Sequence, residues 1–248
     1  MNIFHGVFKG RFLSEIGKDK LNNKIWKRII KKRIKGFSRN FNHQISSSIL
    51  PSIFSTIYIN KNVKILDIGS GGLDVYFELN KIIENFQKFN KKKFNKKIFL
   101  DLVEVPEVLD IYKKFKFSKF FSCNFSTNFK IKKYDIIYIS NTLHYIDSPK
   151  IFIDKLVKTN SKYIIINSTR MGDIKTFIAL QNFYKYKIPT WFFNIKSLLK
   201  MFKNYDLIYL NDYLDKYLGK TSEIPMNNYP KKFRLKHSKT IILKSKKI

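Results

Sequence analysis

The stretch KILDIGSGGLDVYF, residues 64–77, carries the residue types best suited to chemistry. An apolar, β-branched run ends in Asp67, and three of the chain's nine glycines follow as Gly69, Gly71 and Gly72. Glycine lets a backbone turn sharply and lets a ligand approach the main chain closely. In an open α/β sheet, ligands bind beyond the carboxyl ends of the strands. The stretch therefore predicts a ligand-binding turn between a strand and a helix, with a plain structural turn as the alternative.

The pattern of this turn excludes two phosphate-binding motifs. The dinucleotide fingerprint G-x-G-x-x-G would need its third glycine at Asp74, and the turn has no G-K-[ST]. An acidic residue followed by G-x-G suits a nucleoside ligand with a cationic or zwitterionic tail. The glycine backbone admits such a ligand, and the carboxylate holds an ammonium group directly or through water.

A second acidic residue, Glu104, ends the next apolar run in LVEVP. A carboxylate at that strand end can accept hydrogen bonds from both hydroxyls of a ribose. The alternative for Glu104 is a surface salt bridge, although the apolar run before it favours a strand-end position. The third run ends in Cys123 and Asn124, and the Asn124 amide is a candidate contact for an adenine edge.

Short apolar runs alternate with helical segments from residue 63 onward, which predicts a doubly wound, mostly parallel seven-stranded sheet. The lysine-rich segment 88–97 is expected to be a solvated loop and the segment 211–238 a long loop, so the last strand should run antiparallel. Strands are predicted at 63–68, 98–105, 119–123, 134–140, 162–168, 206–210 and 239–244, and helices at 73–86, from Pro106, at 147–157 and at 194–202.

Residues 1–62 are predicted to form a basic N-terminal helical arm, and residues 63–248 a Rossmann-like domain. The arm has nine Lys and four Arg against two acidic residues. Its segment KIWKRIIKKRIKGF, at 24–37, is basic and amphipathic and could lie on an anionic membrane surface. The preferred interpretation is an ordinary helix that packs Trp26, Ile29, Ile30 and Ile34 on the core.

The net charge of +31 comes mostly from lysine, because only six of the 49 basic residues are arginine. The guanidinium of arginine binds phosphates and bases through two N–H donors at once, which lysine cannot do. Any nucleic-acid binding is therefore expected to be weak and non-specific. The single cysteine, Cys123, excludes an internal disulfide and a cysteine-based zinc site, and the scattered histidines have no metal-ligand spacing. Neither a membrane-spanning run nor a signal-peptide pattern is visible, which predicts a cytoplasmic protein, with peripheral contact at the inner face of the membrane as a further option.

Four motifs together resemble the successive core motifs of class I S-adenosylmethionine-dependent methyltransferases. They are ILDIGSGG, LVEVPEV, YDIIYISNTLHYIDSP and YIIINST, and they cover about residues 63–170. The segments GVFKG, VEVP, NTLHYIDSP and IPTWFF further resemble a family of bacterial methyltransferases found near surface-polysaccharide genes, over about residues 3–210. The chain departs from that family at Leu73 and Asp74, where further glycines often stand.

The resemblance implies S-adenosylmethionine as the cofactor and assigns the strand-end residues to its parts. Asp67, Gly69, Gly71 and Gly72 would hold the methionine part, Glu104 the ribose, Asn124 the adenine, and Ser140 and Asn141 the region near the sulfonium.

Methyl transfer from a sulfonium is an in-line displacement, for which a protein positions two partners and removes a proton from the acceptor. His144 is the candidate base, since an unperturbed histidine pKa of about 6.5 suits the task. The alternative is a structural histidine that caps the loop before Asp147. Substrate contacts are predicted for four more residues, with packing or a surface role as the alternative: Tyr145, Arg170, Asp173 and Trp191.

Three classes of function stay open on the sequence. The expected one is a methyltransferase that acts on a small molecule or a glycan, such as a surface-polysaccharide sugar. An RNA methyltransferase is favoured by the charge, but SNTLHY stands where a target-base motif such as N-P-P-Y would be. A non-catalytic binding or scaffold protein is disfavoured because Asp67 and Glu104 are both present.

Overall fold

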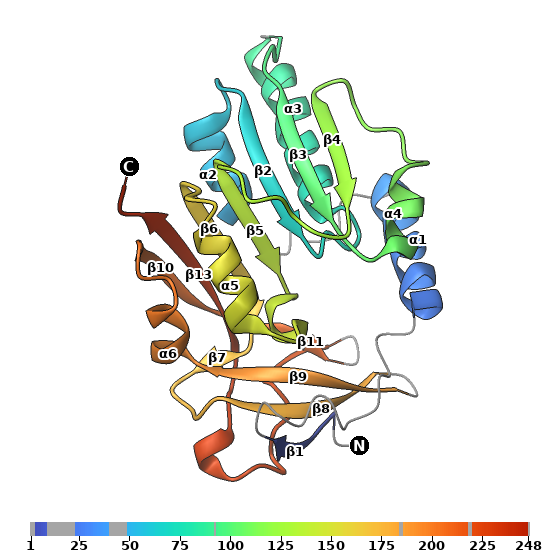
Figure 1. Cartoon of the computed structure of the whole chain (residues 1–248). Coiled ribbons are helices and arrows are strands. Elements are labelled where there is room, and N and C mark those ends of the chain that lie inside the picture. The colour runs from blue at the N-terminus through green and yellow to red at the C-terminus, as the bar shows by residue number, and fades with distance from the viewer. Residues whose placement is uncertain are drawn as a thin grey trace. The chain divides into compact units, whose positions relative to one another are not determined.

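The computed structural model describes residues 3–8, 23–39, 49–91, 93–183, 186–217 and 220–247 (Figure 1). The chain divides into two compact units, residues 23–138 and residues 1–22 together with 139–248. The predicted boundary between residues 62 and 63 stays a prediction.

Seven strands form the main sheet, in the order β10-β13-β6-β5-β2-β3-β4. Strands β2, β3 and β4 are parallel neighbours, whereas β13 runs antiparallel to both β6 and β10. This sheet confirms the predicted mostly parallel architecture, with the antiparallel last strand lying between β6 and β10. The strands are β2 (Val63–Ile68), β3 (Ile98–Val103), β4 (Phe121–Ser126), β5 (Ile136–Ser140), β6 (Tyr163–Thr169), β10 (Tyr205–Tyr213) and β13 (Ser238–Ser245).

Strand β2 is the best-covered strand of the unit 23–138. It reads VKILDI and buries five of its six side chains, as expected of a parallel strand covered on both faces. Strand β4 begins two residues later than predicted and continues to Ser126, because it stays in parallel register with β3 from Phe121 onward. The helices of this unit are α1 (Asn23–Arg39), α2 (Ile49–Ile53), which continues as a π-helical turn over Phe54–Tyr58, α3 (Asp74–Asn90) and α4 (Pro106–Tyr112).

An aromatic cluster packs the start of α3 against β4. The Tyr76 ring meets the rings of Phe115, Phe117 and Phe121 edge-on, at centroid distances of 5.4, 4.9 and 4.7 Å. Edge-to-face contacts of this kind add to the stabilisation from burial alone. They fix the first turn of α3, which follows the glycine turn directly.

The predicted solvated loop at 88–97 is partly wrong. Its first three residues continue α3 to Asn90, and Phe94 is buried, with its ring 5.4 Å from that of Phe120. The lysine-rich composition of the segment predicted a solvated loop. Composition does not predict the burial of a single aromatic residue such as Phe94.

The other unit contains a second, four-stranded sheet that the sequence reading missed. Its strands lie in the order β1-β8-β9-β7, with β8 antiparallel to both β1 and β9. A proline inside a run lowers a strand prediction, and Pro189 lies inside β9. The strands are β1 (Phe4–Phe8), β7 (Met171–Gly172), β8 (Phe177–Phe183) and β9 (Tyr186–Asn194), and the helices of this unit are α5 (Pro149–Val157) and α6 (Ile195–Lys200).

The predicted long loop at 211–238 is also partly wrong. Strands β11 (Asp215–Tyr217) and β12 (Lys220–Ser222) form a two-stranded sheet, and a short 3₁₀ helix spans Lys231–Phe233. Met226 and Tyr229 are buried in the core of the four-stranded sheet, so part of this segment is packed and not a solvated loop.

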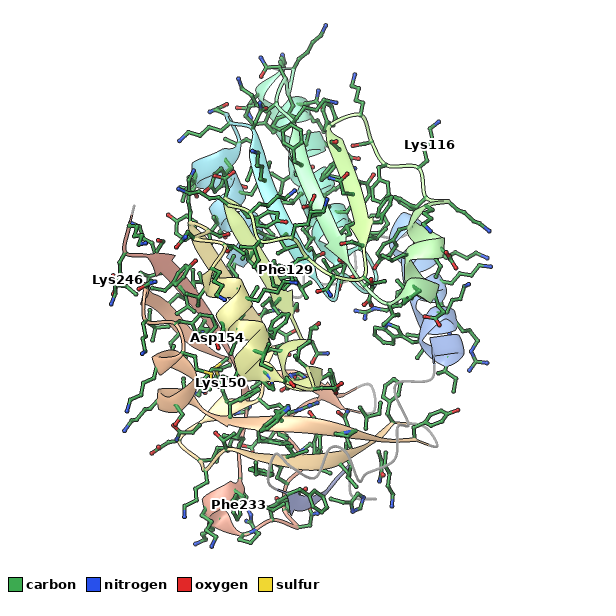
Figure 2. The ribbon with its side chains drawn as sticks, in the orientation of Figure 1. Lys116, Phe129, Lys150, Asp154, Phe233 and Lys246 are labelled. Atoms are coloured by element: carbon green, nitrogen blue, oxygen red, sulfur yellow. The ribbon has the colours of Figure 1, made fainter. Side chains whose placement is uncertain are left out.

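The lysine side chains largely point into solvent. Figure 2 shows Lys116 and Lys246 extending away from the ribbon, and both residues are exposed. Lys246 pairs with Asp206 at 3.6 Å across an exposed surface, where such a pair contributes little to stability. The charge of these two lysines therefore lies on a solvated surface.

The turn between β2 and α3 passes through three residues with positive φ. They are Gly69 at 72°, Gly71 at 48° and Leu73 at 63°. The left-handed conformation costs a non-glycine residue energy, so a further glycine at position 73 would be less strained. The side chain of Leu73 is fully buried, and this burial offsets the strain.

We expect Leu73→Gly to be at least as stable as Leu73→Ala. Both variants lose the buried side chain, at a cost of about 2–5 kcal/mol, but only glycine relieves about 1–2 kcal/mol of left-handed strain. Chemical denaturation gives both unfolding free energies. Leu79, buried within α3, is the control: there the alanine variant should be the more stable by about 1 kcal/mol. If the glycine and alanine variants have the same order of stability at positions 73 and 79, left-handed strain at Leu73 does not determine the result.

Candidate functional site

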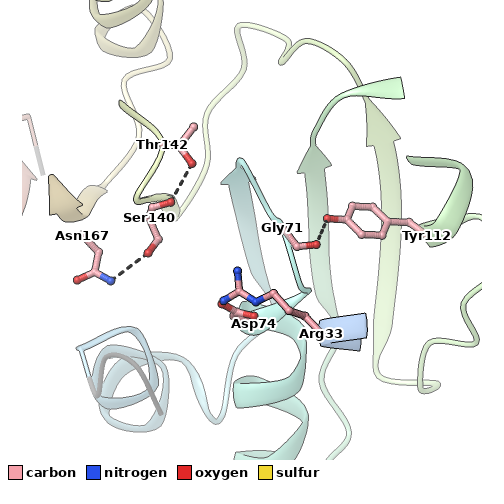
Figure 3. Close-up of polar contacts among 7 residues, drawn as sticks. All are labelled: Arg33, Gly71, Asp74, Tyr112, Ser140, Thr142 and Asn167. Atoms are coloured by element: carbon pink, nitrogen blue, oxygen red, sulfur yellow. Dashed lines mark hydrogen bonds and ion pairs between the residues drawn. The ribbon is translucent and has the colours of Figure 1, made fainter. Parts of the chain in front are cut away.

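Hydrogen bonds fix the glycine turn from two sides. The Ser70 hydroxyl donates to the Asp67 carbonyl at 2.9 Å, and the Tyr112 hydroxyl donates to the Gly71 carbonyl at 2.6 Å (Figure 3). The amide of Gly69 donates to the last residue of β3 at 2.9 Å. The predicted glycines thus lie on a fixed loop at the carboxyl end of β2, as an open α/β sheet requires of a ligand site.

Four carboxylates gather at this turn, those of Asp67, Asp74, Glu78 and Glu104. Asp67 and Glu78 are buried residues. In the described part of the chain, no group donates a hydrogen bond to Asp67 Oδ2 or Asp74 Oδ1, although both atoms are buried. Burying an unpaired carboxylate oxygen is costly, so these two atoms indicate a place for a hydrogen-bond donor or a cation from outside the described residues.

The environment opposes the ionised form of these carboxyl groups. Burial, and then the charge of Asp74, raises the pKa of Asp67 well above its ordinary value. Burial, followed by the charges of Asp74 and Asp67, raises the pKa of Glu78 to about 8. Arg33 Nη2 lies 3.3 Å from Asp74 Oδ2 and offsets part of this cost (Figure 3). The chain has only 18 acidic residues against 49 basic ones, so a group of four carboxylates at one turn is not expected from its composition.

Glu104 follows the last residue of β3, and within the described residues it forms hydrogen bonds and no surface salt bridge, which corrects that alternative. Its Oε1 accepts a hydrogen bond from Trp26 Nε1 at 2.9 Å, and its Oε2 accepts one from the Val105 amide at 3.1 Å. Asn124 lies inside β4, where its side-chain amide donates to Asp101 Oδ1 at 2.9 Å. The adenine contact of Asn124 stays a prediction.

In the other unit, Ser140 is the last residue of β5 and Asn141 follows it directly. The Asn167 side-chain amide donates to Ser140 Oγ at 3.1 Å, and the Thr142 hydroxyl donates to the Ser140 carbonyl at 2.8 Å (Figure 3). Asn141 has a φ of 51°, and its amide donates to the Asn167 carbonyl at 2.9 Å. The sequence reading missed Asn167, which joins the ends of two strands.

Arg170 is buried, so the surface role considered for it is wrong. Its guanidinium donates to Thr190 Oγ1 and, at 3.2 Å, to Gln181 Oε1, and it lies 4.9 Å from the ring centroid of Phe4. The Tyr145 hydroxyl donates to the same Gln181 oxygen at 2.8 Å. The structure therefore brings Tyr145 and Arg170 together, along with polar partners on β8 and β9 that the sequence did not reveal.

His144 is fully buried beside Tyr145, with ring centroids 4.3 Å apart. Among the described residues, neither ring nitrogen of His144 has a hydrogen-bond partner, so it does not cap the loop before Asp147. Burial, and then the charge of Arg170, lowers its pKa well below 6.5. The imidazole is thus neutral at pH 7.

The two remaining predicted substrate residues lie elsewhere in this unit. Asp173 is exposed and lines a surface pocket with Lys175 and Lys232. Trp191 is half-buried and stacks on Phe193 at a centroid distance of 5.9 Å. Their contacts with a substrate stay predictions.

Three solved structures with similar folds are described as methyltransferases. One, assigned as an S-adenosylmethionine dependent methyltransferase from Listeria monocytogenes, is 10% identical, with a TM-score of 0.53 over 82% of this chain and 98% of that one. Another from Mesorhizobium loti is 8% identical, with a TM-score of 0.50 over 84% and 100%. The glycopeptide N-methyltransferase MtfA, complexed with S-adenosylhomocysteine, is 6% identical, with a TM-score of 0.50 over 82% and 91%.

The chain has the class I methyltransferase fold. No protein-family model matches the sequence, and no curated protein matches it.

Within the described ranges, no group of three or more His, Cys, Asp or Glu residues could hold a metal ion. No helix in those ranges is both long enough and apolar enough to cross a membrane.

We expect Glu78 to make the protein less stable as the pH rises. The pKa of Glu78 is about 8 in the folded protein but near 4.3 in an unfolded chain, so its contribution is fully present below the unfolded value and is lost as the pH rises through about 8. Glu78→Gln removes this titration. The variant should therefore lose less stability than the wild type between pH 5 and 9, by an amount on the order of a few kcal/mol.

Denaturation at a series of pH values measures this difference. Glu84→Gln is the matched control, because Glu84 lies on the same helix and its carboxylate is exposed in a surface pair with Lys81. That variant should follow the wild-type curve. A Glu78→Gln curve parallel to the wild type would show that Glu78 titrates normally.

Proposed function

We propose that this chain is an S-adenosylmethionine-dependent methyltransferase. The observation that carries the proposal is the group of buried carboxylates at the glycine turn, with Asp67 Oδ2 and Asp74 Oδ1 lacking donors among the described residues. S-Adenosylmethionine has a sulfonium and an ammonium group, so it offers the positive charge and the N–H donors that these oxygens lack. When bound, it supplies an electrophilic methyl group for transfer to a nucleophile.

The chain's own residues then have distinct parts in binding. Asp67 accepts the ammonium group, and the glycine backbone lets the methionine part approach the main chain. Glu104 accepts the ribose hydroxyls and Asn124 reaches the adenine. The remaining cofactor contacts proposed are those of Gly69, Gly71, Gly72, Ser140 and Asn141.

For the acceptor we propose a small molecule or a glycan, including the sugars of surface polysaccharides. Tyr145, Arg170 and Gln181 form a polar cluster that could bind hydroxyl or anionic groups; Arg170 and Gln181 are buried and Tyr145 is half-buried. His144 would take the proton of the acceptor, because burial keeps it neutral and both of its ring nitrogens lack partners among the described residues. Asp173 and Trp191 complete the proposed substrate residues.

An RNA acceptor is the second candidate, and the net charge of +31 is the observation that favours it. Lysine-dominated charge gives a salt-sensitive attraction without base readout. Filter binding at increasing salt separates the two candidates. Weak binding that disappears at physiological salt supports the first, and nanomolar affinity for one structured RNA at that salt supports the second.

We expect the purified protein to bind S-adenosylmethionine with micromolar affinity, and Asp67→Asn to weaken this binding by about ten-fold or more, the effect of losing a hydrogen bond to a charged group. The variant keeps the shape of the side chain and removes its charge. Isothermal titration calorimetry measures both affinities.

Asp206→Asn is the matched control, because Asp206 carries the same carboxylate on an exposed edge strand of the other unit. It should bind the cofactor as the wild type does. A wild-type protein that binds neither S-adenosylmethionine nor S-adenosylhomocysteine would refute the proposed function.

We expect His144→Ala to lower turnover by about 10²–10⁴-fold if the acceptor is a hydroxyl, since general-base catalysis contributes about that much. Because the pKa of His144 is lowered, wild-type activity should persist well below pH 6.5. The assay follows the formation of S-adenosylhomocysteine with the identified acceptor across pH 4–8. Lys150→Ala, an exposed change on α5, is the control. Wild-type turnover in His144→Ala would remove His144 from the catalytic residues.

A further inference from the structure

Helix α1 presents one face to the carboxylates of the glycine turn. Trp26, Ile30 and Arg33 are spaced four and three residues apart, so they share one side of the helix. Trp26 Nε1 donates to Glu104 Oε1 at 2.9 Å, and Arg33 Nη2 lies 3.3 Å from Asp74 Oδ2. Ile30, between them in sequence, is fully buried. The helix therefore contacts two of the four carboxylates with two hydrogen-bond donors.

The carboxylate of Glu104 is held at both oxygens. Trp26 donates to Oε1, and the Val105 amide donates to Oε2 at 3.1 Å. The backbone amide of Glu104 donates to the Ser126 carbonyl at 3.1 Å, which fixes its main chain at the end of β3. Each carboxylate oxygen accepts two hydrogen bonds. Within the described ranges, each oxygen of Glu104 thus keeps one acceptor position, and a vicinal diol offers two matching hydroxyl donors.

The indole also favours the acceptor form of this carboxylate. Burial raises the pKa of Glu104, and the hydrogen bond from Trp26 counters that effect more than the bond from Val105 does. An indole N–H is a donor only, so it stabilises the ionised group. A protonated glutamic acid would offer a hydrogen where a ribose hydroxyl needs an acceptor.

We propose that Trp26 is a positioning residue that holds Glu104 as the acceptor for the two ribose hydroxyls of an adenosine cofactor. This inference rests on the proposed function and extends it to α1, whose inner face forms part of the wall of the cofactor site. Trp26 acts through Glu104, so its effect should depend on that carboxylate and on the ribose hydroxyls.

The test is Trp26→Phe, which keeps an aromatic ring and removes the N–H. Calorimetry compares S-adenosylhomocysteine with an analogue that lacks both ribose hydroxyls. The affinity of the variant for S-adenosylhomocysteine should fall by about ten-fold, the effect of losing a hydrogen bond to a charged group. The affinity for the analogue should change much less. The decline of affinity on the acid side should also move to higher pH, because Glu104 then protonates more easily.

Two further variants make the result specific. In a Glu104→Gln background, Trp26→Phe should have little further effect, because the charge it acts on is gone. Lys31→Ala, an exposed change on α1, should bind both ligands as the wild type does.

Three outcomes would overturn the inference while leaving the proposed function intact. They are an equal loss of affinity for both ligands, an unchanged affinity, and tighter binding of S-adenosylhomocysteine by Trp26→Phe. The last would mean that the indole competes with the ribose for Glu104. Failure of the wild type to bind either ligand would refute the proposed function itself, so the two failures are distinguishable.

Discussion

The burial of the Asp67 carboxylate is the constraint on which the site depends. Removing this group from water opposes its ionised form, and the charges of Asp74 and Glu104 add to that opposition. If position 67 had only a structural role, an apolar residue at the end of β2 would serve it as well as Asp67 does. Natural sequences keep such locally unfavourable arrangements mainly where function needs them. The cost at Asp67 is therefore the strongest physical reason to place a cationic ligand there.

The second unit presents a buried group of opposite sign. Arg170 lies among aromatic rings and neutral oxygens, and His144 beside Tyr145 is kept neutral by burial and by that guanidinium. Each unit thus buries a different kind of charged group, carboxylates in one unit and a guanidinium in the other. The proposed cofactor has the positive charge that the carboxylates of one unit lack, and the proposed acceptor has hydroxyl or anionic groups of the kind that the guanidinium of the other unit can bind.

The sequence predicted the main sheet well and the second sheet not at all. β2 was evident because a strand buried on both faces reads as a continuous apolar run. β8 and β9 mix polar and aromatic residues, and Pro189 weakened the pattern further. For the site, Asp67 and Glu104 were predicted because a strand end fixes their position. Gln181, Asn167 and the contact of Trp26 could not be, because tertiary packing brings residues distant in sequence together.

The abundant lysines of this chain and the scarce residue types at its glycine turn carry different information. Lysine occurs throughout the sequence and extends into solvent at positions such as Lys116, so its abundance says little about any one position. The informative residues are of the scarce types. Acidic residues, arginine, glycine and tryptophan are all few in this chain, yet one turn gathers four carboxylates, Arg33, three glycines and Trp26. Because a bias toward lysine would not concentrate these less common residue types at one place, their convergence is best explained by a ligand.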